Sequence, residues 1–137
     1  MANVTDYQIT EEGPRNAVIK LTGVLDSSDV YLRPAVALNM FNSNEPNARL
    51  VGLRVDLIEF SLGGNLEALL EWQAATPQQI YNISRSGKIF AYGYGGFVPD
   101  QLRSGYTGDI NLKTAGQAPG STQVYTIVLE LVKLYKA

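Results

Sequence analysis

The stretch Leu50–Gln73 constrains the fold more than any other, because apolar residues alternate with polar ones on both sides of a turn signal. Every second position is apolar before and after Gly63-Gly64-Asn65: Leu53, Val55 and Leu57, then Leu66, Ala68, Leu70 and Trp72. Period-two alternation is typical of strands that bury one face. Glycine and asparagine accept the positive φ of a tight turn. The pattern therefore predicts a long antiparallel hairpin.

A helix over Asn65–Ala75 is the alternative for the second half of this stretch, since leucine, glutamate and alanine are good helix formers. The flanking segments are strand-like, and Pro77 ends the run early, so we favour a strand. On this interpretation Trp72 lies on the buried face. Its indole N–H then needs a hydrogen-bond acceptor inside the fold.

Length and charge exclude several classes of protein. A chain of 137 residues fits one domain, and a charged fraction of 18% argues against disorder. The net charge is −2 and there is no basic block, which disfavours nucleic-acid binding. No apolar run is long enough to cross a bilayer, and the segment 1–4 does not resemble a signal peptide. We expect no nucleic-acid or membrane partner.

The sequence contains no cysteine and no histidine. Their absence removes disulfides, thiolate nucleophiles, zinc–sulfur sites, Ser-His-Asp triads and imidazole ligands. We therefore expect no metal, no cofactor and no enzymatic activity. The eight tyrosines, thirteen glycines and many β-branched residues suit a β-protein with many turns.

Short alternating segments follow one another along the rest of the chain. Beyond Leu50–Gln73, the predicted strands are Tyr7–Glu11, Ala17–Gly23, Val30–Arg33, Gln79–Ile83, Lys88–Tyr94, Ile110–Thr114 and Gln123–Tyr135. Pro34 is expected to break the third of these, and Pro34–Phe41 to form either a helical turn or an irregular segment. Gln123–Tyr135 is apolar on both faces, which predicts a central strand. Together they predict an all-β fold, a jelly-roll-like antiparallel β-sandwich of about eight strands in one domain over residues 1–137.

Aromatic residues form the most suggestive candidate site. Phe90, Tyr92 and Tyr94 fall on one face of the predicted strand Lys88–Tyr94, and Phe97 continues the series. Such a face could stack on sugar rings, as in a carbohydrate-binding module. A core or protein-interface role is favoured, because exposed apolar patches usually mark interfaces. We take these four residues as a candidate interface.

Carboxylates on predicted strands raise the question of hydrolase chemistry: Glu59, Glu67, Glu71 and Glu130. Glu67 and Glu71 are four residues apart on the polar face of one strand. Spacing alone sets no catalytic distance between two carboxylates. A solvated strand face is the favoured interpretation.

Several short motifs, spread over nearly the whole chain, resemble a family of tailed-bacteriophage virion proteins. They are Gly13-Pro14-Arg15-Asn16-Ala17-Val18-Ile19, Leu21-Thr22-Gly23-Val24-Leu25-Asp26, Trp72 with Ala75-Thr76-Pro77, Thr107-Gly108-Asp109-Ile110, and Val128-Leu129-Glu130-Leu131. The resemblance implies a non-enzymatic structural protein of the virion, first of all a head decoration (cement) protein, with a neck, tail or head-fibre component as the alternative. It implies binding to the major capsid protein or other virion proteins, synthesis in the host cytoplasm, and a homo-oligomer such as a trimer.

Polar loops are the expected contact points with capsid subunits. Asn42–Asn47, Val98–Ser104 and Ala115–Ser121 are long for hairpin connections, and long loops in compact domains are often functional. Ala2–Asp6 lacks a strong strand pattern and is expected to lie along a neighbouring subunit. Two other classes stay open: a carbohydrate-binding module of an adhesion device using Tyr92 and Tyr94, and a hydrolase using a carboxylate pair.

Overall fold

The computed structural model describes residues 3–43 and 47–136, and this part of the chain contains nine strands and two 3-10 turns. The strands are β1 (Val4–Glu12), β2 (Asn16–Leu25), β3 (Tyr31–Val36), β4 (Arg49–Leu62), β5 (Glu67–Trp72), β6 (Gln78–Ser84), β7 (Ser86–Phe90), β8 (Ile110–Ala115) and β9 (Gln123–Lys136). The turns are η1 (Leu38–Met40) and η2 (Tyr92–Tyr94).

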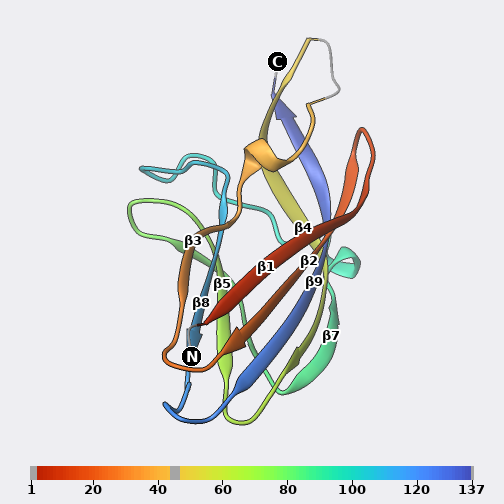
Figure 1. Cartoon of the computed structure of the whole chain (residues 1–137). Coiled ribbons are helices and arrows are strands. Elements are labelled where there is room, and N and C mark those ends of the chain that lie inside the picture. Colours follow the sequence, from red (N-terminus) through yellow and green to blue (C-terminus); the bar gives the residue numbers. More distant parts are fainter. Residues whose placement is uncertain (1–2, 44–46, 137) are drawn as a thin grey trace.

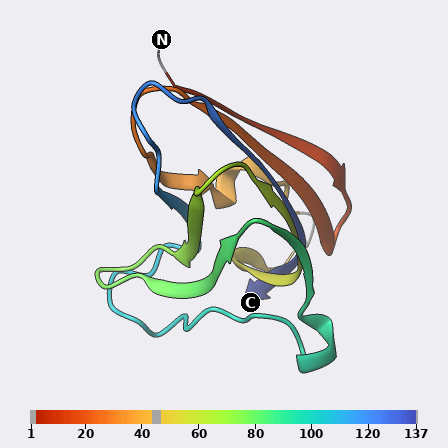
Figure 2. The same cartoon turned by 90° about the horizontal axis from the view of Figure 1, so that it is seen from below.

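The strands form two antiparallel sheets that pack face to face (Figures 1 and 2). Sheet A has the order β1-β2-β9-β4-β7, and sheet B has the order β3-β8-β5-β6. With β1 set aside, the two remaining four-stranded orders are those of a jelly roll, in which the chain crosses repeatedly between the sheets. The predicted jelly-roll-like β-sandwich is confirmed.

The predicted hairpin between β4 and β5 is wrong, although both segments are strands and the helix alternative is rejected. β4 pairs with β9 and β7 in sheet A, whereas β5 pairs with β6 and β8 in sheet B. The Gly63 N–H donates to the Val124 carbonyl at 2.9 Å and holds the end of β4 on β9, and the chain then crosses to the other sheet. Alternation shows which face of a strand is buried, but it does not identify the neighbouring strand.

Trp72 confirms the predicted strand phase. Its side chain is 2% exposed, and its indole Nε1–H donates to the Leu53 carbonyl at 3.2 Å. Leu53 belongs to β4 and Trp72 to β5, so this bond links the two sheets. The core between them is built from the inward positions of both sheets, including Ile58, Leu70 and Ile127.

β9 is the middle strand of sheet A, as predicted, and pairs with both β2 and β4. Its inward residues are fully buried, from Tyr125 through Leu131. On its outer face Val128 and Val132 are only half-buried. The second apolar face therefore belongs to the surface of the molecule.

Pro34 does not end β3, which corrects the prediction that it breaks this strand. β3 continues to Val36, and its register with β8 shifts between Leu32 and Val36, where the Arg33–Pro34 peptide bond is cis. β3 is an edge strand, and an edge tolerates a residue without an N–H. The helical turn that was left open for Pro34–Phe41 is η1.

Candidate interaction surfaces

The four aromatic residues of the candidate interface do not share one strand face, which corrects the sequence interpretation. β7 ends at Phe90, and residues 92–94 form the turn η2. Gly95 and Gly96 have φ values of 85° and 83°, a left-handed conformation that other residues rarely adopt. They fold the chain back so that Phe97 forms a bridge with Val55. The period-two pattern therefore ends at Phe90, before the glycines.

The aromatic side chains consequently divide into two groups. Phe90 and Tyr92 are 50% and 53% exposed and meet edge to face, with ring centroids 5.6 Å apart. Phe97 is half-buried and stacks on Tyr81 at 5.8 Å. The side chain of Tyr94 lies outside the described part of the structure. Phe90 and Tyr92 remain an exposed apolar patch beside β7, and Phe97 packs against the core.

The four carboxylates are divided between the two sheets. Glu59 and Glu130 lie on strands of sheet A, where Glu59 forms an ion pair with Lys88 at 3.1 Å. Glu67 and Glu71 lie on β5 in sheet B. Glu67 is exposed, but Glu71 is 5% exposed, so the prediction of a solvated face is wrong for Glu71.

Glu71 is buried because neighbouring strands supply hydrogen-bond donors to it. The Tyr31 hydroxyl from β3 donates to its Oε2, and Asn111 Nδ2 from β8 donates to the same oxygen at 3.1 Å. The bond to the Glu71 carboxylate is the main cause that raises the pKa of Tyr31. Asn111 Nδ2 also donates to Gln73 Oε1 at 2.6 Å, and Arg33 Nε donates to that oxygen at 2.9 Å. This network could not be predicted from the sequence, since its members come from three segments and alternation marks them only as outward-facing.

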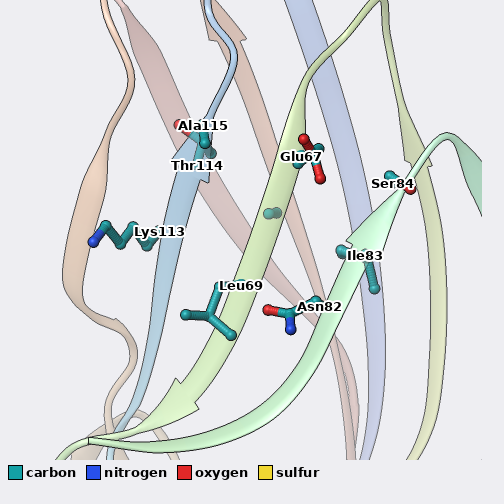
Figure 3. A pocket seen from close by; sticks show the side chains of 9 residues that line it. Glu67, Leu69, Asn82, Ile83, Ser84, Lys113, Thr114 and Ala115 are labelled. Atoms are coloured by element: carbon teal, nitrogen blue, oxygen red, sulfur yellow. The ribbon is translucent and has the colours of Figure 1, made fainter.

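A shallow groove of about 390 Å³ runs over sheet B beside this network (Figure 3). Leu69 and Ala115 contribute apolar surface to it. The carboxylate of Glu67, the amide of Asn82 and the ammonium group of Lys113 contribute polar groups. This mixture of apolar and polar lining could receive a small polyhydroxylated molecule.

The outer face of sheet A carries a row of three exposed valines. Val4 on β1 pairs with Val24 on β2, and Val24 pairs with Val124 on β9. Their exposed fractions are 62%, 38% and 50%, respectively. The next row consists of Asp6, Thr22 and Thr126. This valine row is an apolar surface with a polar margin, and such surfaces mark interaction sites.

β1 forms an open edge of sheet A. Among the described residues it pairs only with β2, and seven of its nine residues are exposed. Val4–Asp6 belong to this strand, so these three residues lie along β2 of the same chain, not along a neighbouring subunit as expected; Asn3 precedes the strand, and Ala2 lies outside the described residues. A long exposed edge strand is a template for pairing with another chain.

Among residues 3–43 and 47–136, no group of three or more carboxylates gathers as a metal site. None of the helical turns in that part of the chain has the length and apolar character that a membrane span requires.

Comparisons with known proteins add little to this picture. No family model matches the chain, and no curated protein matches it. A solved structure described as "CBM4 structure and function" is similar to 98% of this chain and 94% of its own, with a TM-score of 0.29 and 7% sequence identity. Similarity at that level carries no functional argument.

Proposed function

We propose that this chain is a non-enzymatic structural protein of a tailed-bacteriophage virion, a head decoration protein that binds the major capsid protein. The observation that carries the proposal is the valine row on the outer face of sheet A. The protein is made in the host cytoplasm and acts on the assembled head.

The motifs that resemble phage virion proteins occupy structural positions in this fold. Trp72 links the two sheets, and Gly108 has a φ of 89°. A Cβ at Gly108 would lie 2.3 Å from the Leu38 side chain and 2.8 Å from the Val51 carbonyl. The Asp109 carboxylate accepts the Leu38 N–H at 2.8 Å. These residues build a scaffold, which suits a protein that works through its surface.

A small apolar contact can support capsid decoration when the same contact is repeated at many sites. Full burial of a valine side chain contributes about 1.5–3 kcal/mol. A capsid offers the same site many times, and clustered sites strengthen binding without additional contacts if the decoration protein is itself oligomeric. Because the three valines are already about half-buried, covering the row would contribute about half of that free energy per valine at each capsid site.

The loops named from the sequence do not converge on one surface. The Asn42–Asn47 segment, of which residues 44–46 lie outside the described part, precedes β4 near the C-terminal end of β9. Ala115–Ser121 precedes the opposite end of β9 (Figure 1). We therefore assign the capsid contact to the valine row of sheet A rather than to these loops.

The test is the occupancy of purified phage particles by variants of this chain. The double variant Val24→Lys with Val124→Lys places two charges in the proposed contact, and burying unpaired charges is costly. We expect the dissociation constant to rise at least about tenfold, which corresponds to about 1.4 kcal/mol, and occupancy at sub-saturating protein to fall in proportion. Occupancy is measured by quantitative mass spectrometry of the particles, and thermal melting of the isolated variant checks the fold.

Leu102→Lys is the matched control, because Leu102 is 95% exposed and lies in the Val98–Ser104 loop. It should leave occupancy unchanged. An equal loss in the control would assign the contact to the loop, and absence of the wild-type chain from purified particles would refute the virion role itself.

Carbohydrate binding is a second candidate, favoured by the groove on sheet B in Figure 3. The groove places Glu67, Asn82 and Lys113 around apolar surface, away from the Tyr92 and Tyr94 positions considered from the sequence. On this alternative, a glycan array detects binding that Asn82→Ala abolishes and Tyr92→Ala preserves. If only Tyr92→Ala abolished glycan binding, the carbohydrate site would lie at η2 instead of the groove. If wild type bound no glycan, carbohydrate binding would be ruled out as a function.

A further inference from the structure

The two outer edges of sheet A carry opposite charge. β1 contains Asp6, Glu11 and Glu12 and no lysine or arginine. The other edge has Lys88 within β7 and Arg85 just before it, and the segment 84–97 has no acidic residue. Lys88 pairs with Glu59 of the neighbouring strand β4 at 3.1 Å, but its side chain remains 45% exposed and open to a second carboxylate. One edge of the sheet is thus acidic and the other is basic.

Both edges are open to a further strand in the described structure, where β1 pairs only with β2 and β7 only with β4. β1 keeps a regular register from Val4 to Ile9 before it shifts, and β7 runs from Ser86 to Phe90. The two free runs are therefore of similar length. The Tyr7 N–H currently donates to the Asp6 carboxylate at 2.8 Å, a local bond that a carbonyl of an added strand would replace.

Lys88 at one edge and Asp6 at the other also point to the same side of the sheet. Lys88 lies opposite Glu59, and the same row continues through Val128 and Lys20 to Gln8. Asp6 is two positions from Gln8 on the same strand, so its side chain shares that face. If a second copy continued sheet A, the Lys88 ammonium of one copy and the Asp6 carboxylate of the other would project from one continuous surface.

We propose that copies of this chain associate head to tail, with β7 of one copy added to β1 of the next. The opposite charges of the two edges favour this arrangement over the pairing of two identical edges. Pairing β1 with a second β1 would bring together the Asp6 and Glu11 carboxylates of each copy, since the Glu12 carboxylate is already paired with Lys133, and pairing β7 with a second β7 would bring together cations. The contact would also cover exposed apolar residues at both edges, namely Val4 and Tyr7 on one side and Phe90 and Tyr92 on the other.

The sheet topology indicates the form of the assembly. Four antiparallel steps separate β1 from β7, so the two edge strands run in the same direction. A rotation about an axis along the strands preserves that direction, and β7 of one copy then adds parallel to β1 of the next. The contact joins two different edges, so it is heterologous and repeats until a ring closes. The inference does not depend on the virion role.

The test is the mass of the purified full chain in solution. Native mass spectrometry and sedimentation over a range of concentrations should give species above the 14.9 kDa monomer. Association should weaken when the salt is raised from about 0.1 M to about 1 M, because salt screens exposed charges. A wild-type chain that remains monomeric at every concentration and at low salt overturns the proposal.

Charge reversal distinguishes this contact from other forms of association. Asp6→Lys alone and Lys88→Glu alone should each weaken association by about tenfold or more, since like charges then face each other. The two substitutions combined in one chain restore an opposite-charge contact and should restore association. Glu130→Lys on the central strand β9 is the control, with the same change in net charge and no expected effect. Equal effects of Asp6→Lys and Glu130→Lys, or no recovery in the double variant, overturn the assignment to these edges.

The outcome can be separated from that of the proposed function. A monomeric chain that still occupies particles contradicts head-to-tail association and leaves the virion role intact. An oligomeric chain that is absent from purified particles contradicts the virion role and leaves the edge contact intact.

Discussion

Trp72 shows how one residue can tie the two sheets together. Its ring is buried between them, and its N–H is satisfied by the Leu53 carbonyl of the opposite sheet. Trp72→Ala should cost about 3–5 kcal/mol of unfolding free energy, because it removes a large buried ring and leaves a cavity. Urea unfolding measures this cost. A change of only a few tenths of a kcal/mol would mean that the ring is not part of the core.

Tyr125 is a buried residue whose hydroxyl has no hydrogen-bond partner among the described residues. Its side chain is 2% exposed, and burial raises its pKa to about 12. Tyr125→Phe removes the unsatisfied hydroxyl and should leave stability unchanged or raise it by up to about 2 kcal/mol at neutral pH. Thermal melting and urea unfolding measure the difference, and a clear loss of stability would show that the hydroxyl has a partner.

The pH dependence of Tyr125 provides an independent check. A tyrosine with a raised folded-state pKa loses protons first in the unfolded chain, so it destabilises the fold as pH rises from about 10 towards 12. Wild type should lose stability relative to Tyr125→Phe across that window.

Gly23→Ala tests the packing around the same ring, since a Cβ at Gly23 would lie 2.1 Å from the Tyr125 ring, and this variant should be less stable than wild type at every pH.

At the scale of elements, the turn after β4 decides the path of the chain between the sheets. Gly64 has a φ of 61°. A β-branched residue there is strained, so Gly64→Val should cost about 1–2 kcal/mol, whereas Gly64→Asn should cost clearly less because asparagine tolerates the left-handed region. Chemical denaturation of the two variants side by side measures the contrast. Equal stability would mean that the turn relaxes to another conformation.

At the scale of the whole molecule, a buried lysine joins three distant segments. Lys133 on β9 is 4% exposed, and its Nζ donates to the Glu12 carboxylate of β1 at 2.8 Å and to the Asn42 carbonyl at 2.6 Å. The hydrogen bond from Lys133, followed by that from the Asn42 N–H, holds the pKa of Glu12 below its usual value. These hydrogen bonds hold the end of β1 and the segment at Asn42 against the C-terminal part of β9.

The lowered pKa of Glu12 predicts acid sensitivity. A depressed folded-state pKa contributes stability above the ordinary glutamate pKa of 4.5, and this stability is lost as the pH falls through the folded-state value. Glu12→Gln should therefore be less stable than wild type at neutral pH, and the difference should shrink below about pH 4.5. Thermal melting from neutral to acidic pH measures it, with Glu11→Gln as the exposed neighbouring control. A difference that stays constant with pH would contradict the role of the Glu12 charge.

Local sequence pattern was enough to predict the fold class, most of the strands and the burial of Trp72. Alternation is a property of one strand and its solvent exposure, so β2, β8 and β9 could be identified from local pattern alone. Gly23, where the predicted strand Ala17–Gly23 ends, lies inside β2, which continues to Leu25.

Strand neighbours and side-chain contacts depend on long-range packing and could not be predicted from the sequence. β4 and β5 alternate alike, yet they lie in different sheets, because the pairing of each strand depends on partners far away in the sequence. The alternation predicts Glu71 on the surface, but β3 and β8 bring Tyr31 and Asn111 to its carboxylate and bury it. The valine row and the two charged edges likewise depend on register and strand order, which arise from long-range packing rather than from local pattern.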